Sequence, residues 1–329
     1  GNRRSESVLG NAMLTYRKQL KKHFIDVLGL AELEKNTYTG FYTTVTNFSS
    51  DLMGFDNLQA GALRPWEGTG SYYEEPHLAS FLGRVNYTYD DRYVLTVNAR
   101  TDASSKFGAN HKWGFFPSVS AAWNVSNEQF MKQITWIDNL KLRASYGLVG
   151  SDETGTDYGH FLYLDKVELN NIKYSTGYDW NTTFGGPKIS SYHVLDAGWE
   201  RSKKLDIGLD MTLFRYWNIT ADYFYEKRSN ILMQRKTWPS QLGYSATPWS
   251  NVGKVDNWGW EVSTSYHHAV NKDLSMDIRA NFTYVENKYV YRDEPYTPYP
   301  WKRETGRPLN STWGYIAEGL YQTEDEIKY

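Results

Sequence analysis

The 329-residue sequence contains no cysteine, which excludes disulfide scaffolds, zinc–thiolate sites and cysteine nucleophiles. It also lacks any run of about 18 apolar residues, so it offers no transmembrane helix. The formal net charge of −2 argues against a nucleic-acid partner and against a polybasic membrane-surface segment. A mean hydropathy of −0.65 still fits a membrane-spanning barrel, because barrel strands alternate outward apolar with inward polar residues.

Common catalytic signatures are missing too: there is no H-E-x-x-H, Walker loop, G-x-S-x-G or G-x-G-x-x-G. His193 and Asp196 could pair at the mouth of a barrel, although two solvated loop residues are the simpler interpretation. Asp152, Glu153 and Asp157 could bind calcium, but their spacing departs from the EF-hand pattern and favours a solvated acidic loop. We therefore assign no catalytic residue, metal ligand or cofactor.

A secretory signal peptide is also absent, because Gly1–Gly10 has no apolar segment. The last residues, Thr323–Tyr329, are charged and resemble the interior of a loop. We expect both ends to be cuts within a longer chain.

Aromatic residues, by contrast, are abundant: they make up 16% of the chain, with 27 Tyr and 13 Trp. Such an excess suits rings at membrane interfaces or a carbohydrate-binding surface, and an ordinary aromatic-rich β protein is the alternative.

Period-two alternation is the dominant pattern, as in Leu205, Ile207 and Leu209 against Asp206 and Gly208. It predicts an all-β, antiparallel, up-and-down transmembrane β-barrel. The expected strands are 11–18, 23–34, 78–89, 92–102, 113–124, 139–149, 201–214, 217–229, 252–269 and 274–289. A tilted strand needs about 9–11 residues to cross a bilayer, which most of these segments provide.

The connections between these strands alternate short and long. The short ones are 19–22, 90–91, 125–138, 215–216 and 270–273, and the long ones are 35–77, 103–112, 150–200, 230–251 and 290 onward. Outer-membrane barrels have short periplasmic turns and longer extracellular loops, which fixes the expected orientation. We expect a helical turn within 127–133. A soluble sandwich is the competing fold, but it does not explain this alternation.

The expected long loops carry a set of aromatic residues beside Asn, Asp and Gln. Such rings can contact sugar faces or a protein partner, while loop self-packing and an extracellular girdle are the alternative readings. The candidates for substrate or partner contact are Trp66, Tyr72, Tyr73, Tyr178, Trp180, Trp238 and Trp249.

Several motifs occur in a characteristic order. They are SFLGRVNYTYDDRYVLTVNARTDASSKF at 80–107, WGFFPSVSAAWNVSNEQFM at 113–131, LKLRASYGLVGS at 140–151, Trp199-Glu200 with 204–210, NVGKVDNWGWE at 251–261 and GYIAEGLYQTEDEI at 314–327. In this order they resemble SusC/RagA-type TonB-dependent outer-membrane transporters, over about 80–327.

The resemblance implies that 1–329 is part of a larger, 22-stranded barrel, with the plug domain and the closing strands outside this chain. It implies active import of a nutrient, an oligosaccharide in preference to a peptide, across the outer membrane and within outer-membrane lipid. The implied partners are a SusD-like surface lipoprotein and, through absent N-terminal parts, the TonB complex. The alternatives are a complete ten-stranded, omptin-like enzyme and a secreted carbohydrate-binding β-sandwich.

Overall fold

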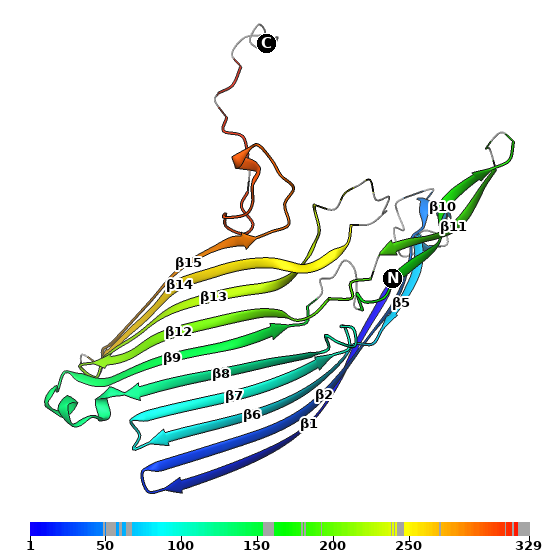
Figure 1. The fold of residues 1–329 in the computed structure, drawn as a ribbon. Helices are drawn as coiled ribbons and strands as arrows, with labels where there is room; N and C mark the ends of the chain where they lie inside the picture. The colour runs from blue at the N-terminus through cyan, green and yellow to red at the C-terminus, as the bar shows by residue number, and fades with distance from the viewer. Residues whose placement is uncertain are drawn as a thin grey trace.

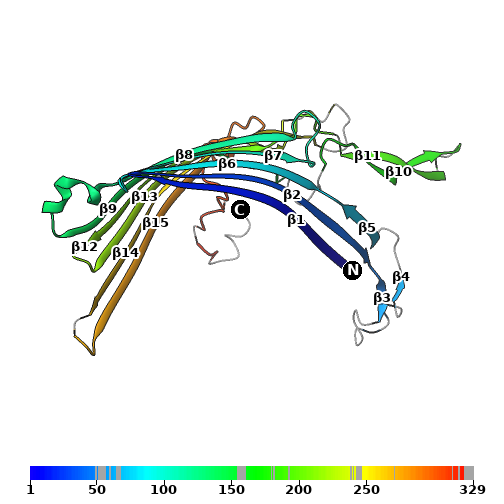
Figure 2. The ribbon, with the colours of Figure 1, turned by 90° about the horizontal axis from the view of Figure 1, so that it is seen from below.

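One curved antiparallel sheet dominates the computed structural model and forms an arch (Figure 1, Figure 2). The structure describes residues 1–48, 50, 57–58, 61–63, 68–153, 161–178, 180, 182–191, 193–237, 239, 241, 247–269, 271–312, 314–317 and 319–321. Among these residues, no helix has the length and apolar character needed to span a membrane.

The arch contains all ten predicted strands, in chain order and with each strand pairing with the next. They are β1 (Asn2–Leu20), β2 (His23–Thr43), β6 (His77–Tyr89), β7 (Tyr93–Ser104), β8 (Trp113–Asn124), β9 (Ile137–Ser151), β12 (Glu200–Leu213), β13 (Trp217–Gln234), β14 (Trp249–Ala269) and β15 (Ser275–Tyr291). The ten predicted strands are therefore confirmed. Several of them extend further than predicted at the end of the sheet that carries the long connections, which we call the loop end. There β1 and β2 stay paired as far as Asn2 and Phe41, although clear alternation has ceased.

Shorter strands lie within two segments that were predicted as loops, which is a correction to the prediction. In 35–77, β5 (Thr69–Glu74) pairs with β2, and β3 (Thr46–Phe48) pairs with β4 (Gly61–Leu63). In 150–200, β10 (Lys166–Thr176) and β11 (Thr182–Ser191) form a hairpin. The β10–β11 pairing shifts register twice, so its strands give no clean period-two pattern.

The short connections gather at the other end of the sheet, which we call the turn end (Figure 1). Two of them have consecutive residues with positive φ, Asp90–Asp91 and Phe214–Arg215. This conformation matches the right-handed twist of the flanking strands in tight hairpins. The connection 125–138 holds two 3-10 helices, η4 (Val125–Asn127) and η5 (Gln129–Gln133), which confirms the predicted helical turn.

One face of the sheet carries an apolar band of uniform length on its last four strands. Alternate residues are apolar over 205–213 on β12, 217–225 on β13, 258–266 on β14 and 276–284 on β15, apart from Thr264, which bonds Trp217. The cross-strand register aligns both ends of the spans on β12, β13 and β14. The span on β15 is offset from them by two residues, because Tyr284 pairs with Trp260 and Ile278 with Tyr266. Ile207, Trp260 and Phe282 are each more than half exposed on this face. Nine residues match the thickness that a tilted strand must cross in a bilayer.

The opposite face is polar and carries networks of charged side chains. Arg143 lies 3.1 Å from Asp210, 2.8 Å from Asp222 and 3.6 Å from Asp206. Gly208 pairs directly with Arg143, and a Cβ there would lie 2.6 Å from the guanidinium carbon. Charged groups at this density require water or a polar partner, so this face is the inner face of a barrel wall.

Candidate functional surface at the loop end

A buried aromatic cluster organises the loops at the loop end of the sheet. It contains Phe107, Phe116, Leu162, Val194, Ala197 and Trp199. Trp199 meets Phe107 and Phe116 edge to face, with ring centroids 5.5 and 5.2 Å apart, and its indole N–H donates to the Lys112 carbonyl at 2.9 Å. Two connections, 103–112 and both ends of 150–200, are thereby packed against β8.

Polar clamps surround this cluster. The Asn251 side chain bonds both the amide and the carbonyl of Gly198, each at 3.1 Å. Asp152, from the predicted acidic group, accepts from the Ser104 hydroxyl at 2.8 Å and lies 3.4 Å from Lys106. Its charge is therefore compensated by structural partners. The described residues contain no cluster of metal-binding side chains, and Asp157 lies outside them.

The His193–Asp196 pair suggested by the sequence does not form. His193 instead uses its backbone amide and its ring to bond Asp165, both at 2.9 Å. These two bonds lower the pKa of Asp165 below its usual range. Asp196 is 98% exposed and lies 3.9 Å from His111. The pairing therefore ties 193 to 165 and closes the base of the β10–β11 hairpin.

A second polar cluster, which sequence reasoning missed, surrounds Glu75 between β5 and β6. Glu75 accepts from Tyr73, lies 2.9 Å from the ammonium of Lys35 and is 3.0 Å from the ring of His77. Hydrogen bonds from Tyr73, Lys35 and His77 lower the pKa of Glu75 to about 2. Tyr73, Glu75 and His77 are close in sequence, but Lys35 is on β2, so strand pairing is needed to bring it to them.

The predicted contact residues fall into three groups. Tyr72 lies over Gly40, the residue opposite it, and its hydroxyl accepts from Arg3, while the neighbouring Tyr73 is 65% exposed. Trp249 packs against the aromatic cluster.

Tyr178 and Trp180 form the third group, at the tip of the β10–β11 hairpin, and they are 105% and 71% exposed. This hairpin extends beyond the end of the sheet (Figure 1). Trp66 and Trp238 lie outside the described residues.

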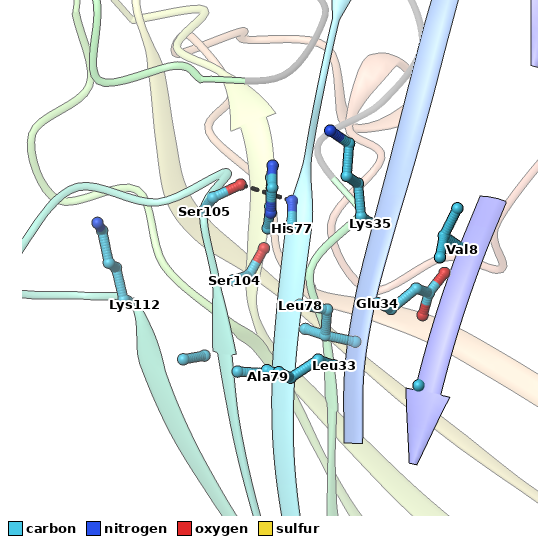
Figure 3. Close-up of a pocket in the computed structure, with 12 residues that line it drawn as sticks. Val8, Leu33, Glu34, Lys35, His77, Leu78, Ala79, Ser104, Ser105 and Lys112 are labelled. Atoms are coloured by element: carbon cyan, nitrogen blue, oxygen red, sulfur yellow. Dashed lines mark hydrogen bonds between the residues drawn. The ribbon is translucent and has the colours of Figure 1, made fainter. Parts of the chain in front are cut away.

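A groove of about 460 Å³ lies at the loop ends of β1, β2, β6 and β7 (Figure 3). Leu33, Leu78 and Ala79 line its lower part, and Lys35 and His77 point away from them (Figure 3). Lys35 and His77 both pair with Glu75, so these two side chains at the rim already have a carboxylate partner.

At the loop end, the aromatic cluster and its hydrogen bonds thus hold the loops in place, and aromatic side chains at the tip of the β10–β11 hairpin are exposed. This arrangement suits recognition of a partner or ligand. A family model described as "TonB dependent receptor-like, beta-barrel" matches residues 5–319. The chain belongs to the TonB-dependent receptor β-barrel family.

Named relatives agree with this assignment. TonB-dependent receptor P3 of Formosa agariphila is 30% identical over 97% of this chain and 32% of its own length. TonB-dependent receptor SusC of Bacteroides thetaiotaomicron is 31% identical over 68% of this chain and 23% of its own length. The chain thus spans about a third or less of the relatives it matches. The resemblance to SusC/RagA-type receptors is confirmed.

Solved structures support the fold of this family member. The RagAB peptide importer in its "open-open" state aligns with a TM-score of 0.72 at 24% identity, covering 92% of this chain and 32% of that one. The outer membrane transporter YddB from Escherichia coli aligns with a TM-score of 0.57 at 11% identity, over 87% and 34%. At these identities the likeness shows the barrel fold.

Proposed function

We propose that this chain forms part of the wall of an outer-membrane importer that takes up a nutrient with energy delivered through TonB. Membership of the TonB-dependent receptor family supports this proposal. The observation that carries it is the two-faced sheet, with nine-residue apolar spans on one face and charged networks on the other. In this proposal the substrate crosses without a broken bond, and the chain is not an enzyme.

We place the turn end in the periplasm and the loop end outside the cell. The short connections at the turn end support this, because outer-membrane barrels have short periplasmic turns and longer extracellular loops. Tyr89, Tyr93 and Trp123 form a ladder at this end, with successive centroids 6.5 and 6.4 Å apart, as in an interfacial girdle. Tyr178→Cys should react with a membrane-impermeant maleimide in intact cells, and Lys21→Cys only after permeabilisation. The opposite labelling order would reverse the orientation.

We propose that a SusD-like lipoprotein covers the loop end and contacts the tip of the β10–β11 hairpin. The names of the SusC relative and of the RagAB neighbour support such a partner. Tyr178→Ala/Trp180→Ala should reduce co-purification of the lipoprotein, while Phe130→Ala, which removes an exposed aromatic ring at the turn end, should not. Equal recovery with all variants would remove the hairpin from the interface.

For the substrate we propose an oligosaccharide, because exposed aromatic rings suit stacking on sugar faces. The name of the RagAB importer makes peptides the alternative class. The full-length receptor with its lipoprotein should bind members of an oligosaccharide panel in calorimetry, and uptake should stop when TonB is deleted. Binding of peptides alone would change the substrate class, and uptake that persists without TonB would refute the energised mechanism.

A further inference from the structure

Two lysines stand directly opposite each other just beyond the apolar band. Lys203 on β12 pairs in register with Lys227 on β13, two residues past Leu205 and Tyr225 respectively. Both are exposed on the same face as the apolar band. Like charges directly opposite on adjacent strands are destabilising. Lys203 has Leu148 as its other neighbour, and neither lysine forms a salt bridge within the described residues.

The same row continues across the next two strands. Lys227 is opposite Asp256, and Asp256 is opposite Lys288. The ammonium groups of Lys227 and Lys288 lie 5.4 Å from the ring centroids of Tyr225 and Trp258, the last aromatics of the band. Both ammonium groups thus lie over aromatic rings at the edge of the band, within the distance at which a cation is attracted to a ring face.

Cations outnumber carboxylates in this region. The basic residues facing outward are Arg201, Lys203, Lys227, Lys254 and Lys288, all of them exposed. The facing carboxylates are Asp256, which accepts from the Tyr225 hydroxyl at 2.9 Å, and Glu286, which accepts from Tyr284. Lys35 differs from these residues, because its ammonium group lies 2.9 Å from the carboxylate of Glu75.

We propose that Lys203 and Lys227 together bind the phosphate of a lipid headgroup in the leaflet that meets the loop end. Phosphates lie immediately outside the hydrocarbon layer, where the register places this row, and a bound phosphate would convert the Lys203–Lys227 repulsion into two attractions. Acyl chains would then lie along the apolar band. The inference rests on the proposed placement of the sheet in the outer membrane, and it adds a specific lipid site to it.

The test compares two double variants of the full-length, delipidated receptor by native mass spectrometry. Lys203→Gln/Lys227→Gln removes the outward pair, and Lys141→Gln/Lys204→Gln removes the same charge from the inner face of β9 and β12. The probes are diphosphoryl lipid A and its dephosphorylated form. At about fivefold per lysine, the outward variant should bind diphosphoryl lipid A roughly thirtyfold more weakly. The inner variant should bind it like the unmodified receptor.

Equal loss in both variants, or equal binding of the two lipid forms by the unmodified receptor, would overturn the proposal. Thermal unfolding supplies a second readout with opposite signs. Without anionic lipid the outward variant should be more stable than the parent, because the repulsion is gone. With diphosphoryl lipid A the outward variant should be less stable than the parent. If the lipid does not reverse the order of stability of variant and parent, the proposed site is contradicted. Substrate uptake by the same variant separately tests whether import survives.

Discussion

At the scale of single residues, the inner face depends on glycines that leave room for a neighbour across the strand pair. Gly259 lies opposite Phe224, and a Cβ at Gly259 would come within 2.7 Å of that ring and 2.2 Å of the Tyr284 carbonyl oxygen. The second contact is with backbone and has no rotamer that relieves it. Packing against the neighbouring strands therefore explains the glycine in the motif N-W-G-W-E.

Gly259→Ala should destabilise the folded barrel by about 1–3 kcal/mol through overpacking. The matched control is Gly83→Ala, also within a strand, where a Cβ meets nothing within 4 Å. The stability of each variant can be measured as the temperature at which the purified receptor loses its heat-modifiable gel band. Equal midpoints for the two variants would show that Tyr284 and Phe224 give way without cost.

The Glu75 cluster predicts a local pH dependence. The folded pKa of Glu75 is lowered to about 2 from 4.5, so the carboxylate stabilises β5 fully above 4.5 and loses this contribution as the pH falls toward 2. Hydrogen exchange of β5 amides, corrected for intrinsic rates, should therefore accelerate between pH 4.5 and 2. Glu75→Gln should abolish that change and leave exchange in β10 and β11 as before. An unchanged profile in Glu75→Gln would assign the pH response to another group.

At the scale of elements, each strand is defined by its two faces, and adjacent residues on one strand have opposite surroundings. Ala221 lies at the centre of the span 217–225, on the apolar face. Thr220, its neighbour, faces inward and donates to Asp210 at 3.3 Å. The effect of adding a charge at each of these two positions therefore shows which face of the sheet meets lipid and which faces the lumen.

Ala221→Arg should cost about 2–4 kcal/mol, as a cation facing the bilayer midplane does. Thr220→Arg should be tolerated, because Asp210 and Asp222 provide countercharges there. Urea unfolding of the receptor in lipid vesicles would compare them. Equal destabilisation by both would contradict the assignment of the faces.

The loops form a structural element of their own because they share the aromatic cluster. Trp199 is 8% exposed, and Trp199→Ala should cost about 3–5 kcal/mol of loop stability by opening a cavity. Limited proteolysis should then cleave within 193–198 in the variant, while Trp301→Ala, which removes a 59% exposed ring, should leave the loops resistant. Resistance in both would mean that Asn251 and the other polar clamps suffice.

The sequence predicts elements whose signal is local and misses those that depend on distant partners. Ten strands and the helical turn follow from period-two alternation and from short connections. The β10–β11 hairpin does not, although K-V-E-L and I-K-Y-S before Gly177 contain a weak alternation that could have found it. Glu75 with Lys35, and His193 with Asp165, form only through tertiary pairing, so spacing along the chain gives no sign of them.

At the scale of the whole molecule, the sheet is an arch with two free edges (Figure 2). Among the described strands, β1 pairs only with β2 and β15 only with β14. Each edge therefore presents a row of backbone amides and carbonyls without strand partners. Hydrocarbon offers such groups no hydrogen bonds, and each unsatisfied group costs several kcal/mol there, so a membrane sheet must close or be completed by other strands.

The 329-residue chain expressed alone should therefore fail to form a stable monomer in a bilayer. Refolded into detergent micelles, it should elute as aggregates and lack a heat-modifiable band, whereas the same residues within the full-length receptor should show that band. The exposed apolar side chains of β1, among them Met13 and Leu14 at 67% and 77%, add to the driving force for aggregation. A monodisperse, heat-modifiable species of the isolated chain would mean that β1 and β15 pair with each other, and the wall would then be a complete small barrel.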